Sequence, residues 1–309
     1  MKLSRHNYPK FLLLLFLLIF SMHHPQAAAQ TPRRTDTPSI TLGLVSAVSH
    51  KEIEGHFRDL VGYVAQRVFA DSDGQGNVVV ASTVPELAKL LGEKKVDFFM
   101  ESPYPTYVIN NVHGAGSLLL RRWKGGKAEY RSLIATAKDG ATSRLQDLRG
   151  KIIAFEDAES TSGYFLPKLF LQRNGFKLSP VSTLNAAVPP SEVGYIFAQT
   201  QRNLVDLLLK GQVAAGTLSD DDYEMLDERT KAGLNVLAQT ELLPRHLVSV
   251  RKDLAMELIE RLSQILRTMH ETEAGQKILR NADNTLKFDL LPGGEEAMRR
   301  RLLDTFQRP

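Results

Sequence analysis

The chain has 309 residues, enough for one large domain or for two lobes that each bury a core. Its composition, 43% hydrophobic and 24% charged, is ordinary for a soluble globular protein and excludes a collagenous or globally disordered chain. The absence of cysteine excludes disulfides, thiolate metal sites and a lipid-modified cysteine anchor.

The N-terminus has the pattern of a secretory signal peptide. Three basic residues precede the apolar run 11–20, and Ala27–Ala29 supply an A-x-A-like cleavage site. The apolar run is well short of the roughly 20 residues that span a bilayer. We therefore expect residues 1–29 to be removed and the mature protein to be periplasmic. The alternative is an uncleaved N-terminal anchor.

Removal of the signal peptide also removes most of the net charge. It takes away Lys2, Arg5 and Lys10 and no acidic residue, so 36 basic residues oppose 35 acidic ones and the net charge falls from +4 to +1. A nucleic-acid-binding protein would keep a strong basic excess, so we expect no nucleic-acid partner. Residues 30–39 have the polar, proline-containing composition of a linker.

From residue 40 onward, strand patterns alternate with helix patterns. Two helices are expected to begin at capping boxes, one from Ser49 to Glu52 and one from Thr83 to Glu86. The second of these also has Pro85 in its first turn, where proline is well tolerated. The expected elements are strand 40–48, a helix from 50, strand 77–82, helix 86–95 and strand 96–100.

The alternation continues after a hairpin-like stretch at 123–130. Strands that alternate with helices favour a parallel-rich α/β architecture, in which ligands bind beyond the carboxyl ends of the strands. The expected elements are strand 131–137, helix 143–148, strand 151–157, helix 163–176, helix 203–211, strand 213–219, strand 245–251 and a helical region 253–280.

These elements are predicted to form two lobes after the linker. Lobe I comprises residues 40–132 together with 243–309, and lobe II comprises residues 133–242. The chain would cross between the lobes twice, near 131–137 and near 245–251. The two crossings would then form a hinge.

One turn carries most of the functional signal. Ser160, Thr161, Ser162 and Gly163 follow a predicted strand and precede a helix. The amides from Ser162 to Tyr164 would lie at the helix start, lack intrahelical acceptors and favour an anion beside them. The hydroxyls add donors, and Gly163 lets the backbone approach an anion closely. The competing interpretation is that one serine caps the helix and the rest is surface.

The surroundings of this turn resemble a known family. Residues 130–171 contain Asp147-Leu148-Arg149-Gly150-Lys151, then Ser160-Thr161-Ser162-Gly163-Tyr164, with Pro167 following. This order of phrases resembles the periplasmic phosphate-, phosphite- and phosphonate-binding proteins of ABC transporters. A weaker likeness spans residues 40–280.

The resemblance implies a fold and a mode of binding. The fold would be α/β, a type II two-lobed periplasmic-binding-protein fold with two mixed sheets flanked by helices and joined by a two-strand hinge. Residues Ser160–Tyr164 would hold an anionic head group. Lobe I would contribute Tyr104 or Tyr107 from its 101–107 segment, where Ser102 is a further ligand-binding candidate. An inner-membrane permease would be the partner, with no cofactor and no catalysis.

Two departures from the family pattern bear on the ligand. The family often has Gly-Pro-x-x-Tyr after the third strand, whereas Glu101 stands directly before the longer phrase here. A carboxylate that faced the pocket would repel a dianion and favour a zwitterionic or organic ligand. Alternatively, Glu101 points to solvent or pairs with a lysine.

The second departure concerns the loop before helix 203–211. The histidine of the phosphonate binders is missing there, and so is the acid in the strand that follows. Gln201, Thr200 or Arg202 would replace them as polar contacts, although Thr200 alternatively only caps the helix. Phosphonate specificity is therefore not carried over from the family.

The run Asp220–Asp222 admits two interpretations. Its three carboxylates could hold a metal, but acids after Ser219 are more typical of a helix start, where they oppose the helix dipole. Asp220 or Tyr223 would still reach the cleft, because both follow a strand end. No spacing typical of a zinc site occurs among the eight histidines.

The sequence thus predicts a periplasmic solute-binding protein, a monomer that captures a small oxyanion or organophosphorus-type ligand for an ABC importer. One alternative is the same fold serving a sensor system. The other is a secreted enzyme acting on a phosphorylated substrate, although Ser160 and Ser162 have no identifiable general base in the sequence.

Overall fold

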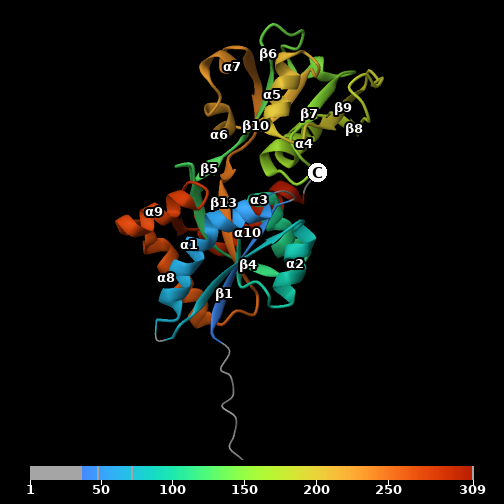
Figure 1. The fold of residues 1–309 in the computed structure, drawn as a ribbon. Helices are drawn as coiled ribbons and strands as arrows, with labels where there is room; N and C mark the ends of the chain where they lie inside the picture. Colours follow the sequence, from blue (N-terminus) through green and yellow to red (C-terminus); the bar gives the residue numbers. More distant parts are fainter. Residues whose placement is uncertain (1–36, 47–48, 71, 308–309) are drawn as a thin grey trace, which may run out of the picture. The chain divides into compact units, whose positions relative to one another are not determined.

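The computed structural model describes residues 37–46, 49–70 and 72–307, so the expected signal peptide and most of the expected linker lie outside the described residues. Residues 37–309 group into one compact unit, in which strands and helices are mixed throughout (Figure 1). Within the described ranges, no helix is long and apolar enough to cross a bilayer.

The first of two six-stranded sheets is mixed, with the order β14-β4-β13-β3-β1-β2. Its strand β1 runs parallel to β2 and β3, whereas β13 and β14 run antiparallel to their neighbours. The strands are β1 Ser39–Val45, β2 Gln75–Ala81, β3 Phe98–Glu101, β4 Gly116–Lys124, β13 His246–Arg251 and β14 Thr285–Leu290.

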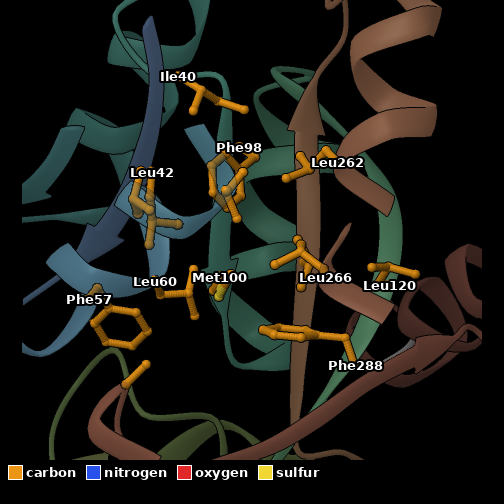
Figure 2. Packing of buried hydrophobic residues seen from close by; sticks show 14 of the residues in the cluster. Ile40, Leu42, Phe57, Leu60, Phe98, Met100, Leu120, Leu262, Leu266 and Phe288 are labelled. Carbon is orange, nitrogen blue, oxygen red and sulfur yellow. The ribbon is translucent and has the colours of Figure 1, made fainter. Parts of the chain in front are cut away.

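Helices cover both faces of this sheet because its strands are apolar on both faces. Phe98 and Met100 belong to the cluster that α1 and α8 cover, and Figure 2 shows both beside Leu262 and Leu266 of α8. Phe99 points to the opposite face, into the cluster under α2. The helices are α1 His50–Val68, α2 Val84–Gly92, α3 Pro103–Tyr107, α8 Met256–Thr268, α9 Glu273–Asn281 and α10 Gly294–Phe306.

The second sheet is also mixed, with the order β11-β6-β10-β7-β9-β8. Strand β7 runs parallel to β9 and β10, and β6 runs antiparallel to β10 and β11. The strands are β6 Ser132–Ala137, β7 Ile152–Phe155, β8 Lys177–Pro180, β9 Glu192–Phe197, β10 Ala215–Ser219 and β11 Leu234–Gln239. The helices are α4 Leu166–Arg173, α5 Gln201–Leu209, α6 Asp220–Glu224 and α7 Glu228–Ala232.

Two short strands join the two sheets. β5 (Glu129–Tyr130) pairs antiparallel with β12 (Leu243–Pro244), and each leads into a longer strand of a sheet. This pair corresponds to the two-strand hinge of the expected fold, and the α/β prediction with two mixed sheets is confirmed. Each sheet draws its strands from one of the two predicted lobes, whose boundaries stay a prediction.

Several local predictions need correction. The first capping box is wrong, because Ser49 has a left-handed backbone (φ 58°) and makes no side-chain cap bond. In the second capping box the N-cap bond is confirmed, because the Thr83 hydroxyl oxygen accepts a hydrogen bond from the Glu86 amide. Strand β1 ends at Val45, three residues earlier than expected. The sequence pattern did not predict β4, β8, β9, β11 or β14 as strands.

Candidate functional site

The hydroxyl turn, residues Ser160–Tyr164, lies beyond the carboxyl end of β7 and leads into α4. Its first residue, Ser160, has an extended backbone, and the π-helical turn Thr161–Phe165 follows directly. The Ser160 hydroxyl accepts the amide of Gly163 at 2.9 Å. Capping by one serine, the competing interpretation, therefore describes Ser160 correctly.

The amides of this turn are bonded differently from the expectation. Besides the Gly163 amide on the Ser160 hydroxyl, the Tyr164 amide donates to the Ser160 carbonyl at 3.2 Å. These two amides are not available to an anion, which corrects that part of the prediction. The amides of Thr161 and Ser162 find no acceptor among the residues that the structure describes.

Gly163 is needed because another side chain fills the space beside it. A Cβ atom at this position would lie 2.5 Å from the Glu156 Cβ and 2.6 Å from the Glu156 Oε2. The Gly163 carbonyl also accepts the Thr217 hydroxyl at 2.7 Å and the Glu156 amide at 3.1 Å. The close approach that glycine allows here is that of an internal carboxylate.

Thr161 joins the hydroxyl turn to the first sheet's 101–107 segment. Its side chain is 1% exposed, and its Oγ1 accepts the amide of Tyr104 at 2.9 Å. The same atom shares a hydrogen bond of 2.9 Å with the hydroxyl of Ser102. The structure therefore brings together Thr161, Ser102 and Tyr104, three of the residues that the sequence predicted for one site.

The two tyrosines of the segment have different surroundings. The Tyr104 ring stacks on Phe165 with an interplanar angle of 17°. The Tyr107 ring lies 5.5 Å from Phe306 at the end of α10 and joins the apolar cluster there. Tyr104 is thus the aromatic side chain that meets the hydroxyl turn.

Tyr164 contributes mainly to the core of the second sheet. Its side chain is buried, and its ring lies in a group of aromatic rings with Phe155, Tyr195 and Phe197. Its hydroxyl accepts the ammonium of Lys168 at 2.9 Å. A direct ligand contact through this side chain stays a prediction.

Glu101 does not follow the alternative expectation of a solvent-facing or lysine-paired side chain, and whether it faces the ligand stays a prediction. Its Oε1 accepts the amide of Val45 at 2.7 Å, so the carboxyl group ties the end of β1 to the end of β3. Burial raises the pKa of Glu101 to about 7, against the lowering effect of its backbone donors and of Arg122. It is bonded to backbone at the carboxyl ends of two strands and not to a lysine.

Gln201 lies at the first turn of α5 and contacts the next loop of the second sheet. Its Nε2 donates to the Asp222 carbonyl at 3.1 Å. Thr200 accepts the amide of Asn203 at 3.1 Å and so caps α5, while a ligand contact through Thr200 stays a prediction. The run from Asp220 does start a helix, because Ser219 accepts the Asp222 amide.

A carboxylate beside the turn escaped the sequence analysis. Glu156 directly follows β7, and its Oε2 accepts the Ser160 hydroxyl at 3.2 Å. Burial, followed by repulsion from Asp222 and Asp157, raises the pKa of Glu156 to about 7. Its place after a strand end was a signal that could have identified it. Within the described ranges, no group of three or more ligating side chains could hold a metal ion.

Tyr130 and Arg245 complete the surroundings at the hinge. Burial raises the pKa of Tyr130 to about 12, against the lowering effect of Arg245 and of the neighbouring Thr161 and Ser162 side chains. The Arg245 guanidinium lies 4.5 Å from the Tyr130 ring and forms an ion pair with Asp221. The side chain of Tyr130, a residue of β5, therefore reaches the hydroxyl turn from the hinge.

The start of helix α2, which packs on the first sheet, also lies near the residues before the hydroxyl turn. Burial raises the pKa of Glu159, just before the turn, and the nearby amide of Val84, the first residue of α2, acts against this rise. An amide at the start of a helix lacks an intrahelical acceptor and favours a negative charge. Glu159 therefore supplies the anion at this helix start.

Comparison with known proteins places this geometry in a family. Residues 42–290 match the family model described as the periplasmic substrate-binding protein of a phosphonate ABC transporter. The phosphate-import protein PhnD of Mycolicibacterium smegmatis is 24% identical over 250 residues, which are 77% of this chain and 73% of that protein.

Solved structures share the fold. The XAC2383 protein of Xanthomonas citri, solved bound to ATP, is 23% identical with a TM-score of 0.80 over 88% of this chain and 98% of its own. PhnD1 of Prochlorococcus marinus, solved with methylphosphonate, is 12% identical with a TM-score of 0.61 over 88% of this chain and 99% of its own. With the family match over most of its length, the chain belongs to the periplasmic substrate-binding proteins of phosphonate-type ABC transporters.

Proposed function

We propose that this chain captures a small oxyanion or an organic ligand with an oxyanion head group for an ABC importer. The site would lie where the hydroxyl turn meets Ser102 and Tyr104. The observation that carries the proposal is the convergence of the Tyr104 amide and the Ser102 hydroxyl on Thr161 Oγ1, each at 2.9 Å.

The donors of this contact satisfy one another without a ligand. Rotation about the hinge would separate Thr161 from Tyr104 and Ser102 and free an amide and two hydroxyls. The amides of Thr161 and Ser162 add two more donors on the same turn. A hydrogen bond to a charged group contributes about 1.5–3 kcal/mol, and micromolar affinity needs about 8 kcal/mol. Four or five such donors are therefore enough, even after the costs of binding.

The similar proteins support a tetrahedral oxyanion as the common chemistry of the ligand. PhnD1 was solved with methylphosphonate, and an alkanesulfonate-binding protein with the same fold was solved bound to MOPS. The family pattern is altered here by the bonded Glu101 and by Gln201 in place of a histidine. We therefore extend the proposed ligands beyond phosphonates to sulfonates and related oxyanions.

The remaining parts of the proposal concern the setting of the protein. Residues 1–29 would act as a cleavable signal peptide, and the mature chain from Gln30 would be a periplasmic monomer. Members of the family work with an inner-membrane permease and an ATPase, and the liganded form would deliver its ligand to such a permease. Binding and release involve no catalytic step and no cofactor.

A binding screen of the mature chain tests the proposal. Phosphate, sulfate, methylphosphonate and methanesulfonate are added at rising concentration, and the melting temperature is followed. A ligand at 100 times its Kd stabilises the fold by about 2.7 kcal/mol. The variant Thr161→Ala should lose this stabilisation, whereas Thr268→Ala, at the exposed end of α8, should keep it. Absence of a shift with every oxyanion would contradict the proposed function.

A further inference from the structure

The hydroxyl turn already holds a negative group that belongs to the protein. Glu156 Oε2 lies 3.2 Å from the Ser160 hydroxyl oxygen. A Cβ atom on Gly163 would lie 2.6 Å from Glu156 Oε2. An oxyanion bound at this turn would therefore be a near neighbour of the Glu156 carboxyl group. The absence of a side chain on Gly163 is what allows this packing.

The charges that face Glu156 come from its neighbour Asp157 and from two further segments. Asp222 in α6 and Asp157 after β7 are acidic and act against its ionised form. Arg245 beside β13 is the cation that favours the ionised form, and it is already in an ion pair with Asp221. The net charge around Glu156 is therefore negative, which is unusual for a place where an anion is expected to bind.

We propose that Glu156 sets the charge of the ligand that this site accepts. It would favour ligands with at most one net negative charge, such as singly charged sulfonates or zwitterions, over dianions such as sulfate. The reason is electrostatic, since the repulsion from a fixed carboxylate doubles when the ligand charge doubles. Rejection by a repulsive group is a common basis of specificity. This inference rests on the proposed function, because it concerns the ligand of the same turn.

This arrangement should make ligand affinity depend on the protonation of Glu156, which a purely structural residue would not do. When Glu156 takes up a proton, its repulsion of the ligand disappears. The affinity for an oxyanion should then fall as the pH rises, by at most about tenfold per pH unit, because at most one proton is bound with the ligand. The fall should occur around pH 7 and above, and it should be steeper for a dianion than for a monoanion.

The test is isothermal titration calorimetry of the mature chain with methanesulfonate and sulfate from about pH 6 to about pH 9, where neither ligand changes its charge. Glu156→Gln removes the carboxylate at nearly constant shape. It should raise the affinity for sulfate at least about tenfold at the upper pH, raise that for methanesulfonate much less, and flatten both pH profiles. Glu228→Gln, an exposed residue of α7, makes the same change of charge and should behave as the wild type.

The outcomes separate this inference from the proposed function. If the wild type binds both ligands with no pH dependence, the inference is overturned and the proposed function stands; this measurement needs no variant. The same holds if Glu156→Gln leaves the ratio of the two affinities unchanged. If only methylphosphonate binds, the test uses this ligand, which becomes a dianion as the pH rises. The dianion should bind the wild type more weakly than the monoanion does, and Glu156→Gln should reduce this loss of affinity. If no oxyanion binds to either chain, the proposed function fails and the inference fails with it.

Discussion

Glu101 accepts the amide of Val45 at 2.7 Å and so fastens the carboxyl end of β3 to that of β1. The two strands are neighbours in the parallel part of the first sheet. The loop that leaves β1 therefore starts from a position that a buried carboxyl group fixes. Burial raises the pKa of this group to about 7, well above its ordinary value of 4.5.

The first prediction concerns the pH dependence of stability. The raised pKa means that folded Glu101 binds more protons than the unfolded chain between about pH 4.5 and about pH 7. Its contribution to the free energy of unfolding therefore falls as the pH rises through this window, by at most about 1.4 kcal/mol per pH unit. In Glu101→Gln this decline should be smaller, as measured by urea unfolding at about pH 5 and about pH 7.

The control for this prediction is Glu54→Gln on the exposed face of α1. It should keep nearly the wild-type dependence on pH, because its partly exposed carboxylate pairs only with the exposed Arg58. An unchanged slope in Glu101→Gln would show that the Glu101 carboxyl group titrates alike in the folded and unfolded chain.

The sequence predicted the strands that are continuous apolar runs, and missed those that are not. Strands β1, β3 and β7 are short apolar segments between helices, and they have the expected positions to within a few residues. Strand β14 mixes buried, half-buried and exposed residues without a regular alternation at a sheet edge, and β9 follows a stretch without helix or strand. Such strands are defined mainly by their neighbours in the sheet, which a single sequence does not reveal.

The sequence predicted which segments of the candidate site come together, and predicted their hydrogen bonds less well. The rule that ligands bind beyond strand ends located both the hydroxyl turn and the 102–104 segment, and Thr161 does contact Ser102. The same rule would have included Glu156, which directly follows β7. What escaped prediction is which donors are already used across the site, such as the Tyr104 amide on Thr161 Oγ1. That bond joins segments far apart in the sequence, which the sequence pattern does not reveal.

The second prediction concerns Gly163. A methyl group there would lie 2.5 Å from the Glu156 Cβ, closer than side-chain carbons approach one another. Gly163→Ala should therefore lower the free energy of unfolding by about 1–3 kcal/mol, because the turn or the strand end must shift. Gly55→Ala is the matched control, since a methyl group at this exposed position of α1 meets nothing within 4 Å. It should stabilise the protein by about 0.5–1 kcal/mol. Equal effects of the two changes in chemical denaturation would contradict the packing described here.

The third prediction concerns Arg122, a guanidinium group that is 1% exposed. Its Nε donates to Thr285 at 2.8 Å, and one terminal nitrogen donates to the carbonyls of Ala282 and Asp283 at 3.1 Å each. The other terminal nitrogen lies 3.2 Å from His246 Nδ1, and burial together with Arg122 lowers the pKa of His246 well below its ordinary value. The neutral imidazole can therefore accept from the arginine.

Arg122→Lys should lower the free energy of unfolding by about 3 kcal/mol, because one ammonium cannot serve acceptors on opposite sides of the guanidinium plane. The neighbouring change Arg121→Lys is the control. The guanidinium of Arg121 donates twice to the carboxylate of Asp289, at 2.9 and 2.7 Å, and a lysine can still pair with this carboxylate. Its cost should be smaller than that of Arg122→Lys, because lysine loses one of two bonds to a single carboxylate and leaves no buried carbonyl unbonded. If Arg122→Lys lowered the free energy of unfolding no more than Arg121→Lys does, the buried hydrogen bonds of the Arg122 guanidinium would contribute little to stability.

The last prediction concerns Arg173, which joins α4 of the second sheet to α10. Its guanidinium donates to the backbone carbonyls of Thr305 at 2.8 Å and of Asp304 at 3.4 Å, at the negative end of the α10 dipole. Arg173→Ala should cost about 1–2 kcal/mol of stability. It should also raise amide hydrogen exchange in the last turn of α10 more than elsewhere, because that turn loses its contact with α4. Arg58→Ala, an exposed ion-pair change on α1, should leave exchange in α10 unaltered. If Arg173→Ala has no effect on α10 either, the helix end is held by its own packing around Phe306, and the contact with α4 is incidental.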